Sequence, residues 1–207
     1  MRPRNRAKTT TGSTRSFITM AANEVRIISG NWKGRKLSFP SAPALRPSLG
    51  RVRETLFNWL RAEIADCRCL DLYAGSGALG FEALSRGAAE VTFVDRDPKV
   101  IKALQANAAR LNAGGCIIVR SSARKFLARA DRPWDIVFLD PPFAEGDLAP
   151  TLDVLREKKL VSQSGLVYFE TSRRMQAELP GWTLVKESTV GESRFGLLAP
   201  ASLPPTA

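Results

Sequence analysis

The residues best suited to chemistry form the tetrapeptide Asp140-Pro141-Pro142-Phe143, which directly follows the apolar run 134–139. This run predicts a buried strand, and the two prolines must end it. Ligands bind beside the carboxyl ends of strands in open parallel sheets, so a carboxylate, rigid carbonyl groups and an aromatic ring are expected together at a site. This combination suits an aromatic amine as ligand: the acceptors would bind its N–H groups, and the aromatic ring of the protein would stack on its face. The alternative is a proline turn with a solvated aspartate.

A glycine-rich segment upstream matches the pattern G-x-G-x-x-G, with Gly75, Gly77 and Gly80 at the glycine positions between an expected strand and an expected helix. Asp95 closes the next expected strand, about twenty residues on, the spacing from which an acid reaches a ribose hydroxyl. Such a loop permits a tight turn and close approach of a ligand to the backbone. The combination predicts a cofactor that contains adenosine, without separating NAD from S-adenosylmethionine.

Asp71 lies in the expected strand before this loop, where a buried charge is costly unless a partner binds it. The ammonium group of S-adenosylmethionine would supply that partner, whereas NAD has no ammonium group there. The N–H groups of the glycine loop are the alternative partner, and Asp71 would then be a structural cap. Asp71 therefore favours S-adenosylmethionine but leaves the structural interpretation open.

Charge is distributed unevenly along the 207 residues, which carry a net charge of +11. Residues 1–66 contain 13 basic and 4 acidic side chains, whereas residues 67–207 contain 18 basic and 16 acidic ones. This asymmetry is typical of a nucleic-acid-facing appendage on a nearly neutral body. The alternative is that the basic residues only keep the surface soluble.

Composition excludes several other classes of protein. The chain contains no histidine, which removes Ser-His-Asp and Cys-His mechanisms and argues against zinc, so no metal site is expected. Its three cysteines (Cys67, Cys69 and Cys116) do not suggest a disulfide framework. This use of cysteine fits a reducing cytosol, so we expect a cytoplasmic protein. No apolar stretch is long enough for a membrane helix.

The N-terminal region is the expected nucleic-acid surface, because residues 25–53 carry seven basic side chains and no acidic one. Short strands are expected at 25–28 and 36–39, with a turn at 30–34 and a helix from residue 48. A tryptophan among cations offers the combination used to grip single-stranded nucleic acid, although it could instead hold the hairpin against the body. The side chains expected to contact nucleic acid are Trp32, Lys33, Arg35, Lys36, Arg46, Arg51 and Arg53.

The remainder alternates strands with helices, which predicts an α/β protein with a parallel sheet covered on both faces. The expected strands span residues 70–73, 90–95, 116–119, 134–139, 165–170, 183–187 and 194–198. One expected helix follows the glycine loop and ends at residue 85, and three others span residues 98–111, 122–130 and 147–158. The last two strands are joined by a turn at Gly191, so we expect a closing hairpin with one antiparallel strand.

These motifs together resemble the Rossmann-like class I methyltransferases that use S-adenosylmethionine to modify exocyclic nitrogens of bases. Over residues 25–199 the chain is similar to the RsmD family, on segments 30–37, 45–47, 51–60 and 70–77 together with the tetrapeptide. Members are bacterial enzymes acting on guanine N2 in small-subunit (16S) ribosomal RNA. The resemblance implies a seven-stranded sheet ordered 3-2-1-4-5-7-6, with the seventh strand antiparallel and an N-terminal hairpin plus helix. The basic extension before Met20 and the glycine at position 50 depart from the family pattern.

The resemblance also implies roles for individual residues. Residues 140–143 would receive the target base and support catalysis. Those expected to bind the cofactor are Asp71, Tyr73, Ala74, Gly75, Ser76, Gly77, Asp95, Arg96, Ser122 and Ala123. We expect a monomer whose partner is ribosomal RNA within a small-subunit particle or assembly intermediate. The rival functions are a nicotinamide oxidoreductase, a methyltransferase acting on adenine in DNA or on another RNA, and a non-catalytic RNA-binding assembly factor.

Four segments are expected along the chain. Residues 1–24 are predicted to be a disordered basic arm or the product of a mis-assigned start, with Met20 as the true one. Residues 25–66 would form the RNA-contacting hairpin and helix, and residues 67–199 the methyltransferase domain. Residues 200–207 are expected to be a flexible tail.

Overall fold

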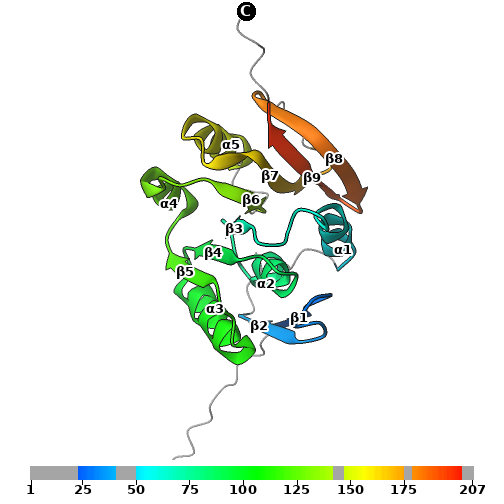
Figure 1. The fold of residues 1–207 in the computed structure, drawn as a ribbon, viewed down its shortest axis with the longest axis vertical. Coiled ribbons are helices and arrows are strands. Elements are labelled where there is room, and N and C mark those ends of the chain that lie inside the picture. The colour runs from blue at the N-terminus through cyan, green and yellow to red at the C-terminus, as the bar shows by residue number, and fades with distance from the viewer. Residues whose placement is uncertain (1–22, 41–49, 142–146, 175–178, 202–207) are drawn as a thin grey trace, which may run out of the picture.

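The computed structural model describes residues 23–40, 50–141, 147–174 and 179–201 of the chain. An open seven-stranded sheet lies at the centre of this described part, with a separate two-stranded hairpin beside it (Figure 1). The sheet contains β3 (Arg68–Asp71), β4 (Glu90–Asp95), β5 (Cys116–Arg120), β6 (Trp134–Leu139), β7 (Val161–Ser172), β8 (Trp182–Val190) and β9 (Ser193–Pro200). The hairpin contains β1 (Asn23–Arg26) and β2 (Lys36–Phe39). The helices are α1 (Gly50–Trp59), α2 (Ala78–Ser85), α3 (Pro98–Leu111), α4 (Ala123–Arg129) and α5 (Leu148–Glu157). Within these ranges no helix has the length and apolarity needed to cross a membrane.

The sheet has the predicted topology. Its strand order is β5-β4-β3-β6-β7-β9-β8, which reads 3-2-1-4-5-7-6 when the strands of this sheet are numbered along the chain. Neighbours from β5 to β7 pair in parallel, whereas β9 pairs antiparallel with both β7 and β8. The predicted order and the antiparallel seventh strand are confirmed. The parallel strands direct their carboxyl ends to one edge, where ligands bind in such sheets.

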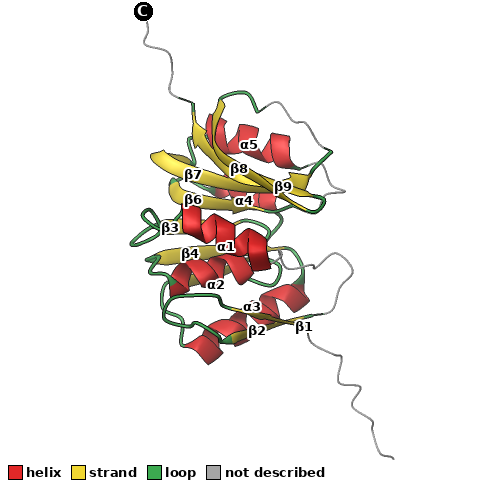
Figure 2. Cartoon of the chain, turned by 90° about the vertical axis from the view of Figure 1, so that its right-hand side faces the viewer, coloured by secondary structure: helices red, strands yellow, loops and turns green. Residues whose placement is uncertain are grey.

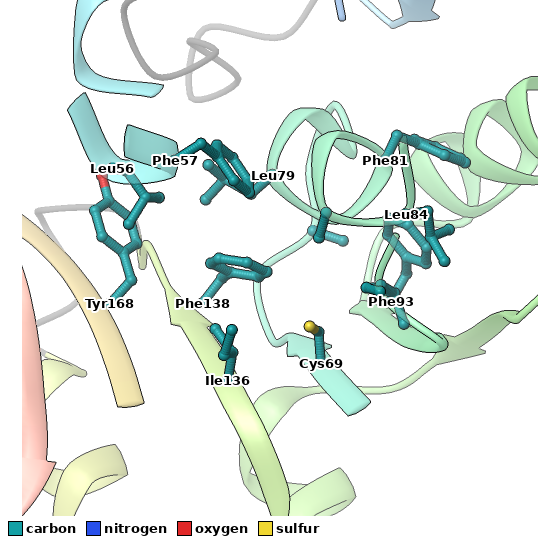
Figure 3. Packing of buried hydrophobic residues seen from close by; sticks show 14 of the residues in the cluster. Leu56, Phe57, Cys69, Leu79, Phe81, Leu84, Phe93, Ile136, Phe138 and Tyr168 are labelled. Carbon is teal, nitrogen blue, oxygen red and sulfur yellow. The ribbon is translucent and has the colours of Figure 1, made fainter. Parts of the chain in front are cut away.

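The central strand β6 is buried on both sides, which explains why its sequence is almost continuously apolar. Side chains alternate between the faces of a strand with a period of two. Ile136 and Phe138 therefore point to the face covered by α1, α2 and α3, whereas Val137 and Leu139 point to the face of α4 and α5 (Figure 2). Figure 3 shows the first of these clusters, in which the rings of Phe57 and Phe138 lie 5.9 Å apart.

Several strands differ in extent from their predicted ranges. β1 begins and ends two residues before the predicted 25–28, and β8 and β9 extend beyond the predicted 183–187 and 194–198. β3 begins and ends two residues before the predicted 70–73, and residues 72–73 form a turn. The Arg68 N–H donates to Asp135 Oδ2 at 2.9 Å, which ties the start of β3 to β6. β7 runs from residue 161 to 172, beyond both ends of the predicted 165–170. Its carboxyl end is extended because pairing with β9 continues as far as Ser172 and Ser193.

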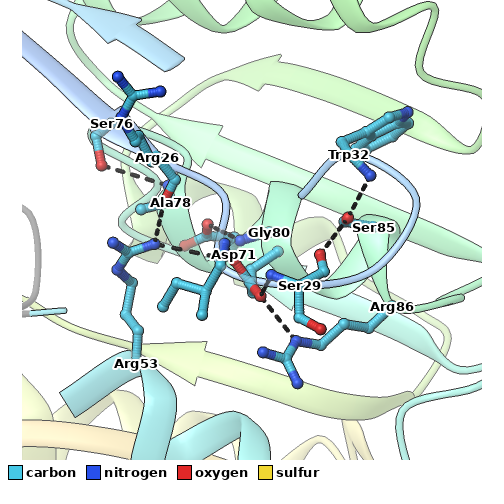
Figure 4. Close-up of polar contacts among 12 residues, drawn as sticks. Arg26, Ser29, Trp32, Arg53, Asp71, Ser76, Ala78, Gly80, Ser85 and Arg86 are labelled. Carbon is cyan, nitrogen blue, oxygen red and sulfur yellow. Dashed lines mark hydrogen bonds and ion pairs between the residues drawn. The ribbon is translucent and has the colours of Figure 1, made fainter. Parts of the chain in front are cut away.

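The N-terminal hairpin is fixed to α2 by a buried carboxylate. Glu82 has no exposed surface, and its oxygens accept the N–H groups of Ile28 at 2.7 Å and Ser29 at 3.0 Å (Figure 4). The Arg86 guanidinium donates to the same carboxylate at 2.8 Å, and that of Arg53 lies 4.0 Å away. One side chain thus satisfies two backbone donors after β1 and pairs with two cations.

Two further side chains complete this attachment. The hydroxyl of Ser85, at the end of α2, accepts the backbone N–H of Trp32 at 2.9 Å. Gly30 has a φ of +80°, and a Cβ there would lie 1.8 Å from the Ser85 carbonyl oxygen, so only glycine fits. Asn107 of α3 accepts the Ser38 N–H at 3.1 Å and donates to the Ser38 carbonyl at 2.9 Å. The hairpin therefore packs against both helices on one side of the sheet.

Candidate active site

The glycine loop leaves β3 at the carboxyl edge of the sheet and ends where α2 begins. Gly77 precedes α2 with a φ of +75°, a left-handed conformation that side chains other than glycine rarely adopt. A Cβ at this position would lie 2.6 Å from the Leu104 side chain and 2.8 Å from the Phe81 ring, so a side chain here would also crowd the core below. The Gly77 N–H donates to the Ala74 carbonyl at 2.7 Å, which closes the turn. Sequence and packing therefore fix a tight loop beside the end of β3.

Asp71 is the last residue of β3, and it is 3% exposed. Its Oδ2 accepts the Gly80 N–H at 3.0 Å, which is the structural capping role foreseen for it. Burial raises the pKa of Asp71 to about 8, against the opposing effect of the Gly80 hydrogen bond and with a smaller contribution from Asp95. A carboxylate can accept several hydrogen bonds, so capping the loop leaves capacity for a cationic ligand group. Such a group would also favour the ionised form.

Asp95 is the last residue of β4, and its hydrogen bonds link the glycine loop to the segments that follow β4 and β5. Its Oδ2 accepts the Gly75 N–H at 3.0 Å, and its Oδ1 accepts the Asp97 N–H at 2.9 Å. The Asp95 carbonyl accepts the Ser121 N–H at 3.0 Å, which places the end of β5 and then Ser122 beside it. The hydroxyl of Ser122 caps α4 by accepting a helix N–H. The predicted ribose and adenine regions are therefore adjacent.

The other residues predicted to bind the cofactor surround these two aspartates, and their roles stay predictions. The hydroxyl of Tyr73 lies 3.3 Å from a carboxylate oxygen at the start of α5, so its ring points away from the hairpin side. Ser76 is buried, and its hydroxyl accepts a backbone N–H in α2 at 3.3 Å. Arg96 is exposed after β4, and Ala123 is the first residue of α4.

Asp140 and Pro141 follow β6, which is the other neighbour of β3 in the sheet. Asp71 pairs in register with Phe138, so Asp140 lies two residues beyond that level at the same edge. Asp140 is half-buried and Pro141 is buried. The predicted residues Pro142 and Phe143 lie outside the described residues. Three adjacent parallel strands, β4, β3 and β6, thus bring three aspartates to one edge of the sheet. No group of three or more His, Cys, Asp or Glu residues in the described ranges could hold a metal ion.

The exposed part of the N-terminal basic surface contains Lys33, Arg35, Lys36 and Arg51. Lys36 forms an ion pair with Glu24 at 2.6 Å, a contact between two half-exposed side chains. Such surface pairs contribute little, so a phosphate could replace the acid. Trp32 is only half-buried and packs against the core, which is the structural alternative weighed for it. The predicted residue Arg46 lies outside the described residues.

Arg53 is the one described residue of the predicted RNA surface that the structure removes from it. It is 4% exposed, and its Nη1 donates to the Arg26 carbonyl at 3.1 Å and lies 4.0 Å from Glu82. Burial lowers the pKa of Arg53. Its position in the first turn of α1 suggested a phosphate partner, but its partner is the buried carboxylate. Phe57, four residues on, is buried on the same helix face, and that spacing could have revealed the inward position.

Sequence reasoning missed several polar residues whose partners are remote in the chain. Glu82 and Ser85 hold the hairpin, and Glu170 forms a buried network in β7. It also missed a cavity of about 410 Å³ lined by β5, α4 and the loop that follows α4. The basic side chains of this lining are scattered along the chain: Arg68, Arg120, Lys125, Arg129 and Arg132.

The strand order, the antiparallel seventh strand and the glycine loop after the first strand define the fold of the Rossmann-like methyltransferases. The three aspartates lie at the edge where this class binds its substrates. The chain belongs to the RsmD family, since the family model described as "Conserved hypothetical protein 95" matches residues 25–199.

Individual relatives agree with this assignment. Ribosomal RNA small subunit methyltransferase D of Escherichia coli K12 is 44% identical over 180 residues, which cover 85% of this chain and 90% of the relative. The protein of the same name from Haemophilus influenzae is 42% identical over 176 residues, covering 83% and 91%. A solved structure of a proposed methyltransferase from Escherichia coli has a TM-score of 0.78 and 42% identity, and the match covers 87% of this chain and all of that one.

Proposed function

We propose that this protein transfers a methyl group from S-adenosylmethionine to the exocyclic N2 amine of a guanine in small-subunit ribosomal RNA. The observation that carries the proposal is the position of Asp140, at the strand end beside the glycine loop and in line with Asp71 and Asp95. The names of the relatives support the class of substrate. Membership of a methyltransferase family argues against the nicotinamide oxidoreductase.

The residues at the sheet edge fit S-adenosylmethionine. Asp71 is a buried carboxylate with a raised pKa and no ion pair among the described residues, so an ammonium group would stabilise its charge. Asp95 would hold the ribose, because each carboxylate oxygen can accept a further hydrogen bond. Ser122 and Ala123 would lie along the adenine. When bound, this cofactor supplies an electrophilic methyl group on a sulfonium.

Asp140 and the Pro141 carbonyl would hold the target amine by its two N–H groups. The lone pair of an aromatic amine is delocalised into the ring, and hydrogen bonds from both protons favour its localisation on nitrogen. They also stabilise the positive charge that develops on this nitrogen during attack. Asp140 need not remove a proton first, because the product ammonium is acidic. Holding the amine in line with the methyl group supplies much of the remaining acceleration.

The exposed basic side chains of the hairpin and α1 would bind the RNA backbone. Lys33, Arg35 and Lys36 lie on the hairpin fixed to α2, the helix that follows the glycine loop. Arg51 lies on α1, whose Arg53 is 4.0 Å from Glu82 of α2. This rigid attachment would hold phosphates at a set position relative to the cofactor. The proposed substrate is RNA within a small-subunit particle or assembly intermediate, so the proposed place of action is the cytoplasm, and the proposed active form is a monomer.

The direct test incubates the protein with labelled S-adenosylmethionine and either free 16S ribosomal RNA or small subunits lacking the modification, followed by digestion to nucleosides. We expect label in N2-methylguanosine. Asp140→Ala should lower turnover by about 10²-fold or more, the effect of removing one well-placed transition-state partner, with cofactor affinity nearly unchanged. Label in another nucleoside, or no transfer to either substrate, would contradict the proposal.

A further inference from the structure

A buried carboxylate lies next to the proposed catalytic aspartate. Glu170 of β7 is 7% exposed, and it accepts the Tyr168 hydroxyl at 2.9 Å and the Ser193 hydroxyl at 2.5 Å. Both donors are neutral, and within the described ranges no lysine or arginine forms an ion pair with Glu170. A buried charge held only by neutral donors is costly for stability. A ligand that donates a hydrogen bond to Glu170 would therefore stabilise its buried charge.

The position of Glu170 is set by the pairing of β6 with β7. These parallel strands are in register at Leu139 and Phe169, so the next residue of each strand is Asp140 and Glu170. Neighbouring strands lie about 4.8 Å apart, which brings the two residues side by side at the carboxyl edge. Burial and then the charges of Glu170 and Asp140 raise the pKa of Tyr168 well above its ordinary value. Both carboxylates thus act on the same phenol from neighbouring strands.

Two adjacent acceptors match the hydrogen-bonding edge of guanine. Guanine carries two donors on nitrogens bonded to the same carbon, the N1–H and the N2 amine, whereas the N1 of adenine is an acceptor. Enzymes that act on extruded bases read this Watson–Crick edge by hydrogen bonds. A carboxylate accepts hydrogen bonds and donates none, so it attracts a protonated N1 and repels an unprotonated one.

We propose that Glu170, oriented by Tyr168 and Ser193, accepts the N1–H of the target guanine while Asp140 holds its N2 amine. Glu170 is then the residue that selects guanine over bases that lack a proton on N1. This assignment rests on the proposed function, because it concerns the same base. It adds a specificity residue that touches the substrate but does not contact the atom that is methylated.

The test compares two substrates that differ at N1 and C6. An RNA that carries the modified guanine is synthesised with guanine or with 2-aminopurine, which keeps the 2-amino group but has no proton on N1 and no oxygen on C6. The missing oxygen is the same for every variant, so a change in preference between variants reports the contact with N1. Wild type should prefer guanine in kcat/KM. Glu170→Gln keeps the size of the side chain and removes its charge, so it should lower kcat/KM for guanine by about 10- to 100-fold, the range for one hydrogen bond to a charged group. Activity on 2-aminopurine should change little, so the preference falls by the same factor.

Two further variants separate substrate selection from structure. Glu192→Gln makes the same change at an exposed site in the β8–β9 turn and should leave the preference unchanged. Tyr168→Phe keeps the buried ring and removes one donor to Glu170, so the preference should fall by severalfold even where Glu170→Gln folds poorly. Cofactor affinity and melting temperature are measured for every variant.

The results distinguish this inference from the function on which it rests. Equal loss on both substrates in Glu170→Gln, with Tyr168→Phe leaving the preference at the wild-type value, would overturn the assignment and leave Glu170 with a structural role. Absence of guanine methylation by wild type would instead contradict the proposed function itself.

Discussion

Replacing Glu82 with alanine should destabilise the protein and release the N-terminal hairpin from α2. The carboxylate is fully buried, and it accepts two backbone N–H groups of the segment after β1. Its removal leaves those N–H groups without their acceptor and leaves Arg53 buried 4.0 Å from where its counter-charge lay. Arg86 is less affected, because its side chain is 15% exposed and can turn to water.

The size of the effect follows from these contacts. Breaking a buried ion pair by removing one partner costs about 3–5 kcal/mol. The loss of the two hydrogen bonds to the carboxylate is part of the same cost and is not added to it. A domain of this kind is stable by about 5–15 kcal/mol, so Glu82→Ala should lose a large part of its free energy of unfolding. Glu82→Gln keeps the volume and one acceptor, and we expect a loss of about 1.5–3 kcal/mol.

Urea denaturation of wild type, both variants and Glu63→Ala measures this difference. Glu63 is exposed after α1, so its replacement should stay within about 0.5 kcal/mol of wild type. Hydrogen exchange at the Ile28 and Ser29 amides reports the hairpin directly, and trypsin should cleave Glu82→Ala faster at Lys33. A loss below about 1 kcal/mol for Glu82→Ala, or unchanged protection of the two amides, would refute the role assigned to Glu82.

Three further predictions concern the cofactor and the RNA. Asp95→Ala should weaken S-adenosylmethionine binding by about 1.5–3 kcal/mol in titration calorimetry, with RNA affinity unchanged. Burial raises the pKa of Asp71 from 3.8 to about 8, so the folded protein keeps a proton that the unfolded chain has lost. The free energy of unfolding should therefore fall as pH rises from about 3.8 to about 8, because the folded protein must lose the proton of Asp71. Asp71→Asn has no such proton, so urea titrations at several pH values should show a smaller fall for this variant. Replacing Lys33, Arg35 and Lys36 together with alanine should lower RNA affinity and reduce the salt slope by about 0.7 per lost phosphate contact, with cofactor affinity as the control.

Much of the fold was predictable because its signals are local. The range of β4 agrees with the prediction at both ends, since an apolar run and a proline-started helix define it. β6 was recognisable because both of its faces are buried, so its sequence is continuously apolar. The length of β7 was not predictable, because its start pairs with Trp134 of β6 and its carboxyl end pairs with β9, and both partners are remote in the chain.

Some residues of the candidate site were likewise predictable from local sequence patterns and others were not. Spacing alone pointed to the glycine loop and to Asp71, Asp95 and Asp140, because strand ends of a parallel sheet meet at one edge. Arg53 was misread, since its charge was visible in the sequence and its burial was not. The role of Glu82 depends on backbone groups 53 and 54 residues away, so no local pattern in the sequence reports it.

The aspartates at the strand ends, with Asp71 ionised once a cationic ligand group lies beside it, give a locally negative region to a protein with a net charge of +11. Under the proposed reaction, the methyl donor enters as a sulfonium cation and leaves as a neutral thioether. Each turnover therefore removes the sulfonium charge, while the ammonium group proposed to contact Asp71 stays on the product. The loss of one of two positive charges weakens the attraction of these carboxylates for the product and favours its exchange for a new donor. The same carboxylates repel phosphate. The RNA backbone is thus directed to the basic hairpin, and only an uncharged base gains by approaching the strand ends.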